Sequence, residues 1–271
     1  MKRLLTVSLL IAILAFQPVI ARPSKGSPEK TFKLPATAQN LGSNVYKLGK
    51  KVDPTTNKQV EGYAFITPKK GYGKPDHAGG PKGGGGETSS TCYAFMSKGA
   101  KWHSAEPWSA DMTNNQGLDS SELFSTQAAS LEKWETGAGN QIFGAGTQQT
   151  GLTADESAPD GKNEVVFGSI DEPGVIAVTI VWGYFSGSPQ QRGLIEWDQI
   201  FDQESFDWSL SGEAGKMDFE NIATHEDGHA AGLSHPDDSC TEETMYRYAS
   251  TGETQKRTLE AGDIAGISSL Y

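Results

Sequence analysis

The sequence predicts an α+β fold because of the order of its patterned segments. One helix with apolar residues at helical spacing comes first, several β-rich runs follow it, and two helices end the chain. The expected helices cover residues 119–134, 218–233 and 258–271, and the expected strands cover 92–96, 164–168, 175–182 and 194–201. This order of elements is typical of an α+β architecture.

The first expected helix has signals at both ends. Asp119 followed by Glu122 resembles a capping box at its start, and Gly137 and Gly139 end the pattern. Its buried stripe is expected to consist of Phe124, Ala128, Leu131 and Trp134.

The first 21 residues have the features of a secretory signal peptide. Lys2 and Arg3 precede an apolar run over residues 4–16, and small or apolar residues precede a cut near Ala21. The alternative is an uncleaved anchor, although Gln17 and Pro18 shorten the run below the about 20 residues that span a membrane. We therefore expect an exported chain with no stable membrane insertion after signal removal.

Residues 22–88 are expected to form a basic pro-segment or N-terminal extension before a folded domain at 89–271. Residues 22–45 are polar and contain three prolines without a clear period, so we expect poor order there. A small hairpin is expected around residues 60–66, and the Gly-rich stretch 71–86 is typical of a flexible linker.

Charge is distributed unevenly along the chain. Lys and Arg outnumber Asp and Glu in residues 22–91, whereas acidic residues dominate 92–271 and give the whole chain a net charge of −11. The two parts either attract each other or are separately solvated, and the sequence leaves both interpretations open.

Three of the five histidines fall within one window of eleven residues. His225 and His229 are four residues apart, so a helix places both imidazoles on one face, where they can bind one Zn²⁺. Glu226 lies one position round the helix. Gly232 can end the helix in a left-handed conformation, so that His235 supplies a third ligand. Three protein ligands leave one position open, as a catalytic zinc site requires. The alternative is a polar helix with surface histidines.

The sequence contains two cysteines, Cys92 and Cys240. An exported chain can keep a disulfide, which would join the first expected strand to the segment just past the zinc ligands. The alternatives are two buried free thiols or a regulatory, zinc-binding Cys92.

The histidine window matches the H-E-x-x-H-x-x-G-x-x-H pattern of the metzincin peptidases. Three further segments resemble the matrixin branch of that group. Residues 218–224 are similar to the start of the matrixin zinc helix, residues 243–248 to the Met-turn, and residues 262–271 to the closing helix. The resemblance covers about residues 92–271 and is strongest to secreted microbial matrixin-like proteases.

This resemblance implies a matrixin-like catalytic fold. Its twisted, mostly parallel sheet would have one antiparallel edge strand and would carry the zinc helix and a C-terminal helix. Residues 194–202 would form the edge strand region, where an extended substrate adds as another strand. Met245 would lie beneath the three histidines, and Tyr248 would form a wall of the pocket for the side chain after the cleaved bond.

Several features depart from the matrixin pattern. Residues 22–91 contain no cysteine, so the usual cysteine switch is missing, and only His77 and His103 remain for a structural zinc site. Arg247 replaces a typical proline. Asp227 occupies a position that is usually apolar, where we expect it to pair with a neighbour such as Arg247 or to point to solvent.

The function expected from the motif and the resemblance is that of a secreted zinc endopeptidase of the extracellular space or matrix. Zn²⁺ held by His225, His229 and His235 would activate a water, with Glu226 as general base. We expect protein or peptide substrates, a monomer and no nucleic-acid partner. One alternative is a secreted zinc-containing binding protein without general proteolytic activity, although the intact Glu226 argues against it. Another is a narrow processing enzyme that acts on one partner.

Ca²⁺ is a secondary candidate cofactor, because hard oxygen ligands suit this ion, but the sequence favours the alternative given below. The acidic side chains in loop-like or strand-end positions are Asp160, Asp171, Asp198, Asp202 and Asp207. The alternative is that these acids only keep the protein soluble, since no spaced calcium-loop motif is present.

Overall fold

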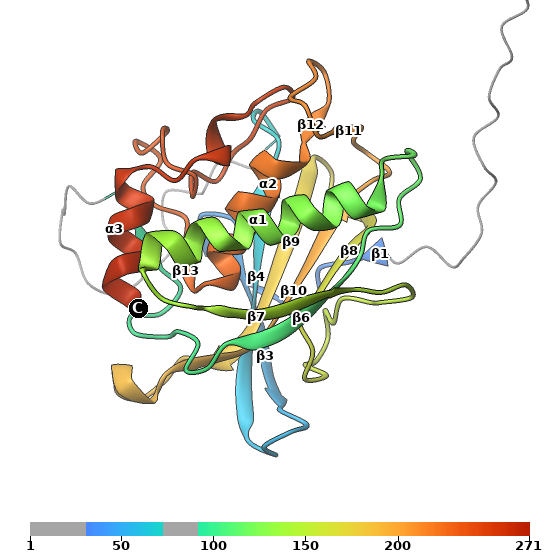
Figure 1. Ribbon diagram of the computed structural model, residues 1–271. Helices are drawn as coiled ribbons and strands as arrows, with labels where there is room; N and C mark the ends of the chain where they lie inside the picture. Colours follow the sequence, from blue (N-terminus) through green and yellow to red (C-terminus); the bar gives the residue numbers. More distant parts are fainter. Residues whose placement is uncertain (1–30, 73–91) are drawn as a thin grey trace, which may run out of the picture.

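The computed structural model describes residues 31–72 and 92–271, and one mixed β-sheet runs through both parts (Figure 1). The signal segment expected at residues 1–21 and the glycine-rich stretch from residue 73 onward lie outside the described residues, as does His77. Within the described ranges, no helix combines the length and the apolar character needed to cross a membrane.

Five strands between residues 106 and 202 form the centre of the sheet. In spatial order they are β7 (Phe143–Gln148), β6 (Glu106–Asp111), β8 (Glu164–Ile170), β10 (Gly193–Asp202) and β9 (Val175–Tyr184). The first four run parallel to one another, and β9 runs antiparallel to β10. The predicted α+β fold, with a mostly parallel sheet and one antiparallel strand, is confirmed.

The expectation that residues 194–202 form the edge strand is wrong. Strand β10 lies between β8 and β9 and pairs with both. All but one of its residues are buried, as expected for an interior strand, although four of the buried residues are the polar Glu196, Asp198, Gln199 and Asp202. The antiparallel strand at the end of this five-stranded unit is β9.

Strands from the N-terminal segment extend the sheet beyond β9. Strand β4 (Gln59–Pro68) pairs with β9, β3 (Val45–Val52) pairs with β4, and β2 (Gln39–Gly42) pairs with β3, all antiparallel. Strand β1 (Thr31–Phe32) pairs with β8.

The hairpin expected around residues 60–66 is confirmed by the pairing of β3 with β4. The expectation of poor order over residues 22–45 is wrong for residues 31–45, which include β1 and β2. Apolar side chains of the N-terminal segment pack into the same core as strands more than a hundred residues later in the chain. This packing is tertiary, so the local pattern of the segment did not reveal it. The buried apolar residues concerned include Phe32, Val45, Leu48 and Phe65.

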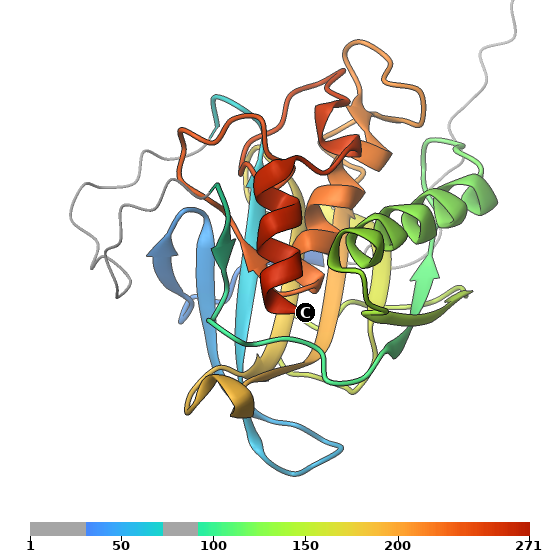
Figure 2. The same ribbon diagram turned by 60° about the vertical axis from the view of Figure 1, so that its left-hand side comes forward.

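Three helices lie against one face of the sheet, as two views of the chain show (Figures 1 and 2). They are α1 (Ser120–Ala138), α2 (Phe219–Ala230) and α3 (Ala261–Leu270). The larger apolar core lies between these helices and the sheet, and a second core, which contains Phe32 and Trp182, lies on the opposite face.

Helix α1 begins where its sequence signals predict, but it continues past the expected end at Trp134, includes Gly137 and stops at the second glycine, Gly139. The Asp119 side chain accepts hydrogen bonds from the backbone N–H groups of Ser121 and Glu122, and Gly139 ends the helix with a φ of 66°. Of the four residues predicted to form the buried stripe of this helix, only two are buried. Leu131 and Trp134 are buried, but Phe124 and Ala128 are only partly buried. The helix is rotated so that it buries Leu123 and the polar residues Gln127 and Ser130.

Short elements complete the chain. Strand β5 (Ala94–Phe95) pairs with β13 (Leu233–Ser234), and β11 (Trp208–Ser209) pairs with β12 (Met217–Asp218). Two turns of 3-10 helix lie at Pro189–Gln191 and Gln255–Arg257. The pairing of β5 with β13 places the segment after Cys92 beside the end of α2.

Candidate metal centre

Helix α2 presents the histidine window from the centre of the fold. Asp218 caps its first turn by accepting a hydrogen bond from the Asn221 N–H at 3.0 Å. Gly232 follows the helix with a φ of 102°, the left-handed conformation expected from the sequence. The chain then reverses into β13, which carries it back to His235.

The structure brings His225, His229 and His235 together in one buried cluster whose ligand atoms all lie within 4.8 Å of one another. The Nε2 atom of His235 lies 3.2 Å from that of His225 and 3.0 Å from that of His229. Two residues come from one face of α2, and the third comes from the segment after the glycine turn.

The hydrogen bonds of the Nδ1 atoms determine the tautomer of each imidazole. Each Nδ1 faces a backbone carbonyl: that of Thr244 for His225 at 2.6 Å, that of Leu233 for His229 at 3.0 Å, and that of Ser43 for His235 at 2.7 Å. Because a carbonyl only accepts, each Nδ1 carries the proton, and this assigns a lone pair to each Nε2 of the neutral rings. A carbonyl partner of this kind is usual for a metal-binding histidine.

Three converging lone pairs repel one another unless a cation lies between them. Tetrahedral Zn²⁺ with Zn–N bonds of about 2.0–2.1 Å separates its nitrogen ligands by about 3.3 Å, close to the spacing of these Nε2 atoms. The donor set therefore fits Zn²⁺.

Burial keeps the three rings in the metal-binding, neutral form. It lowers the pKa of His229 to about 3, and it lowers the pKa values of His225 and His235 well below the ordinary range. Neighbouring histidines lower the pKa values of His225 and His235 further. The site therefore presents unprotonated ligands over the whole neutral pH range.

Glu226 lies beside the cluster, between α2 and the sheet. Its Oε2 atom accepts a 2.5 Å hydrogen bond from the Thr179 hydroxyl on β9, and its Oε1 atom is buried without a hydrogen-bond partner among the described residues. Burial raises the pKa of Glu226 to about 7, against the opposing effect of the bond from Thr179. A carboxyl group with a pKa near neutrality can both accept and return a proton.

Met245 packs against α2 at Gly228, between the two helical histidines. A Cβ atom at Gly228 would lie only 2.2 Å from the Met245 sulfur and 2.7 Å from Cζ2 of Trp134. The absence of a side chain at Gly228 therefore lets the turn that carries Met245 approach the helix.

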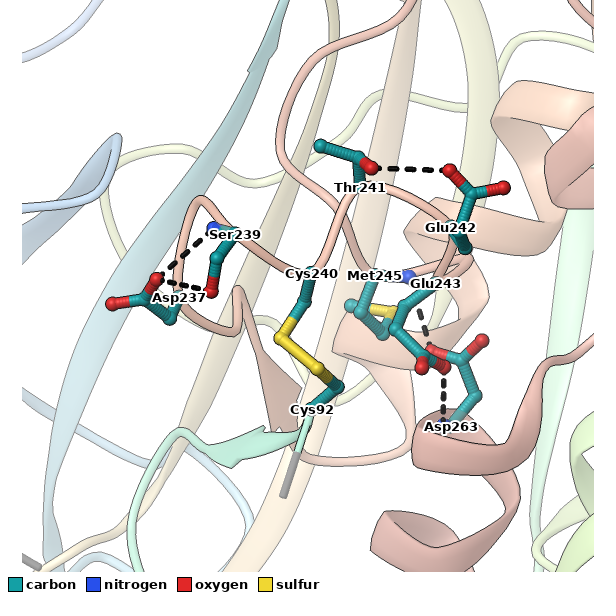
Figure 3. Close-up of a disulfide and its surroundings, with 9 residues drawn as sticks. All are labelled: Cys92, Asp237, Ser239, Cys240, Thr241, Glu242, Glu243, Met245 and Asp263. Atoms are coloured by element: carbon teal, nitrogen blue, oxygen red, sulfur yellow. Dashed lines mark hydrogen bonds between the residues drawn. A yellow bond between two sulfur atoms is a disulfide. The ribbon is translucent and has the colours of Figure 1, made fainter. Parts of the chain in front are cut away.

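The turn around Met245 is held from below by α3 (Figure 3). The backbone N–H groups of Thr244 and Met245 donate to the Asp263 carboxylate at 2.7 and 3.1 Å, and the Asp263 N–H donates to Glu243 at 3.0 Å. The buried Lys256 ammonium donates to the carbonyl groups of Thr244 and Tyr246. The Thr244 carbonyl that accepts from His225 is therefore fixed by two further contacts.

The structure contains the predicted disulfide between Cys92 and Cys240, and it lies close to this turn (Figure 3). The described residues contain no free cysteine, so the alternatives of free thiols and of a zinc-binding Cys92 are wrong. The bond joins the segment just before β5 to the segment just after His235.

The expectations for Asp227 are wrong. It neither pairs with Arg247 nor points to solvent, because its Oδ1 atom accepts hydrogen bonds from the buried side-chain amides of Gln127 at 2.6 Å and Gln199 at 3.1 Å. Arg247 forms an ion pair with Asp238 instead. Burial raises the pKa of Asp227 well above its usual range, against the opposing effect of the hydrogen bonds from the two amides.

Tyr248 and His103 complete the set of residues considered from the sequence. The half-buried Tyr248 ring lies 5.0 Å below the Arg247 guanidinium and 5.7 Å from the Tyr246 ring. His103 lies away from the histidine cluster, with its Nε2 atom 2.9 Å from the Arg192 carbonyl.

A second cluster of possible metal ligands consists of Asp155, Glu196 and Asp198. Burial raises the pKa of Glu196 to about 8 and that of Asp198 well above its usual range, and Oε1 of Glu196 is buried without a hydrogen-bond partner among the described residues. Sequence reasoning found only Asp198 of these three. The alternation of Glu196 and Asp198 along one strand, which places both on the same face, was the available signal.

The N-terminal segment also contributes to the histidine cluster, although no motif in the sequence indicated which of its residues would do so. Besides the Ser43 carbonyl, the Phe65 ring of β4 stacks on His229 with ring centroids 4.3 Å apart. Phe65 is fully buried.

A zinc-binding helix followed by a glycine turn, a third histidine and a methionine-containing turn is the arrangement of the metzincin metallopeptidases. Comparison with protein families identifies the branch of the metzincins to which the chain belongs. The family model described as Matrixin, a group of peptidases, matches residues 94–271. The chain belongs to the matrixin family, and this membership assigns it to the zinc-dependent metalloendopeptidases. The match begins at β5 and does not include β1 to β4. No curated protein gives a significant match to the chain.

Proposed function

We propose that the chain is a secreted zinc endopeptidase in which Glu226 is the general base. The observation that carries this proposal is the convergence of three neutral, carbonyl-anchored histidines beside a buried carboxyl group with a pKa near neutrality. The signal-like first 21 residues and the disulfide support export, because disulfides persist in oxidising compartments.

His225, His229 and His235 would hold Zn²⁺, which when bound lowers the pKa of water and polarises the carbonyl of the bond to be cleaved. Glu226 would take the proton of the attacking water and then deliver it to the amine that leaves. The hydrogen bond from Thr179 would hold this carboxyl group in place. The Met245 turn would support the histidines from below.

Substitution of Glu226 tests the proposal. Glu226→Ala is expected to retain zinc, because all three histidines remain, and to lose about 10²–10⁴-fold in casein hydrolysis, the usual contribution of a general base. Glu220→Ala is the matched control, since Glu220 lies on the same helix and its carboxylate forms ion pairs with Lys133 and Arg257. Casein cleavage by Glu226→Ala at the rate of Glu220→Ala would contradict the mechanism. If no form of the zinc-loaded wild-type protein cleaves casein, the result would instead favour the alternatives of a binding protein or a narrow processing enzyme.

We also propose that Asp155, Glu196 and Asp198 hold Ca²⁺. Their oxygens can approach one ion together, and a cation would neutralise the carboxylates of Glu196 and Asp198, which are both buried. Calorimetric titration with Ca²⁺, compared between wild type and Asp198→Asn, measures this binding.

A further inference from the structure

Lys256 is a lysine that is buried against the turn of Met245. The residue is only 2% exposed, and its ammonium group donates hydrogen bonds to the Thr244 carbonyl at 3.3 Å and to the Tyr246 carbonyl. These carbonyl groups belong to the residues on either side of Met245, so the ammonium group binds the turn at two points. A charged group is costly to bury unless hydrogen bonds compensate for its lost hydration. A lysine here therefore indicates a task that an apolar residue of similar length would not perform.

The ammonium group of Lys256 remains charged at neutral pH. Burial lowers the pKa of Lys256 to about 8, against the opposing effect of the Glu253 and Asp263 carboxylates. The Tyr246 ring, with its centroid 5.2 Å from Nζ, also attracts the positive charge. Because a charged donor forms a stronger hydrogen bond than a neutral one, Lys256 holds the two carbonyl groups more firmly than a neutral side chain would.

The backbone of Lys256 is bound to α2. Its N–H group donates to Oδ1 of Asn221 at 2.7 Å. Asn221 lies four residues before His225, so the two residues share one face of the helix. The neighbouring Arg257 donates two hydrogen bonds to Asp218, the cap of α2, at 2.7 and 2.6 Å. Lys256 therefore connects the turn of Met245 to the first turns of α2, and these are the two elements that meet at His225.

The Thr244 carbonyl links Lys256 to the histidine cluster. It lies 2.6 Å from Nδ1 of His225, whereas the other two histidines have the carbonyl groups of Leu233 and Ser43 as partners. Leu233 belongs to β13 and is held by the pairing with β5, and Ser43 lies in the tight turn between β2 and β3. Thr244 lies outside the helices and strands, so side chains have to set the direction of its carbonyl group. Lys256 supplies this restraint for one histidine of the three.

We propose that Lys256 is a positioning residue of the metal site, which holds the Thr244 carbonyl and thereby fixes the orientation of the His225 ring for Zn²⁺. This inference rests on the proposed function, because it needs zinc to be the ion that the three histidines bind. Lys256 acts through His225 alone and leaves His229 and His235 to their own carbonyl partners.

The sign of the effect on zinc binding separates positioning from charge repulsion. The positive charge of Lys256 is near enough to lower the pKa values of all three histidines. By repulsion alone, removal of this charge would tighten the binding of Zn²⁺. Loss of positioning would weaken it, because groups that orient a metal-bound histidine usually contribute about 10–100-fold to metal affinity. Since Lys256 acts through an intervening carbonyl group, we expect an effect at the lower end of that range.

Three variants isolate this contribution. Lys256→Met removes the ammonium group and keeps an unbranched side chain, whereas Lys256→Gln removes the charge but retains N–H donors. Lys133→Met is the matched control. Lys133 also donates to α2, but to the side chains of Glu220 at 2.7 Å and Thr224 at 3.3 Å rather than to the turn of Met245.

Two measurements on the full chain test the proposal. Competition with a zinc-binding dye at neutral pH gives the affinity for Zn²⁺, and ¹H–¹⁵N spectra of the zinc-free protein report the Nδ1–H group of each histidine. We expect Lys256→Met to bind zinc about tenfold more weakly than wild type and Lys133→Met. Its His225 Nδ1–H signal should be lost, while the signals of His229 and His235 remain unchanged. Lys256→Gln should have an intermediate zinc affinity, and it decides the question if Lys256→Met does not fold.

The positioning proposal is overturned if Lys256→Met binds zinc as tightly as wild type or more tightly. It is also overturned if the signals of all three histidines change together, because a general loosening of the fold would then explain the result. In both cases wild type still binds zinc and the proposed function stands. If wild type itself binds no zinc, while Lys256→Met loses only the His225 signal, the positioning of this ring is supported and the proposed function fails.

Discussion

Gly228→Ala is expected to destabilise the protein, although alanine is the better helix former. In a helix interior with free space, this change contributes about 1 kcal/mol of stability. At Gly228 the new Cβ atom would lie 2.2 Å from the Met245 sulfur and 2.7 Å from Cζ2 of Trp134. Normal carbon contacts are about 3.5–4.0 Å, so Met245 has to move by more than about 1 Å.

Neither neighbour of Gly228 can move without cost. Trp134 is fully buried, and its indole N–H donates to the Thr224 carbonyl at 2.8 Å. Met245 is held through its backbone N–H by Asp263. We therefore place the overpacking cost at the upper end of its usual range, about 3 kcal/mol, which leaves a net loss of about 2 kcal/mol.

Urea denaturation of the zinc-loaded protein, followed by tryptophan fluorescence, measures this loss. A net loss of about 2 kcal/mol corresponds to a decrease in Tm of about 4–8 °C. Gly137→Ala in α1 is the control, because its nearest neighbours would lie at 3.2 and 3.3 Å and can adjust. If Gly228→Ala is as stable as Gly137→Ala, then Met245 and Trp134 do not confine the helix as the structure indicates.

Three further outcomes are expected. Thr179→Val removes the hydrogen bond to Glu226 and should lower kcat about tenfold or more with unchanged zinc content. The reason is that a hydrogen bond to a charged group contributes about 1.5–3 kcal/mol. An unchanged kcat would show that this bond does not position the carboxylate. Burial raises the pKa of Glu196 from 4.5 to about 8, so the carboxyl group is more easily protonated in the folded state. Its stabilising contribution is present below pH 4.5 and lost as the pH rises to about 8. In chelator, urea denaturation should therefore show the wild type losing stability over this window, by on the order of 5 kcal/mol, and Glu196→Gln should flatten the profile. Parallel profiles for the two proteins would refute this role of Glu196. Replacement of Cys92 and Cys240 by serine should cost up to about 5 kcal/mol, since the disulfide closes a separation of 148 residues, and equal urea midpoints for the two proteins would argue against that stabilisation.

Local patterns predicted the zinc helix and its neighbours well. The interval of four between His225 and His229 places both on one helical face whatever surrounds them, and Gly232 adopts the left-handed conformation that its position suggested. The boundaries of α1 followed from Asp119 and Gly139, because capping depends on residues close in sequence.

Buried polar residues were the main source of error. The stripe of α1 was sought among apolar residues, but the helix buries Gln127, whose amide bonds Asp227. Periodicity of hydrophobic residues cannot find such a contact, because a polar side chain becomes stable in the core only when a distant partner satisfies it.

The sequence by itself determined which side chains meet at this site: the three histidines, the glutamate beside them and the turn that brings them together lie within eleven residues. Only the tertiary structure decided which strand forms the edge of the catalytic sheet and what lies on it. Strand β10 is internal, and β4, from a segment whose attachment to the acidic part the sequence left open, pairs with β9 and covers His229 with Phe65. Strand pairing depends on backbone hydrogen bonds between distant segments, which any extended sequence can form, so no local pattern specifies the partner.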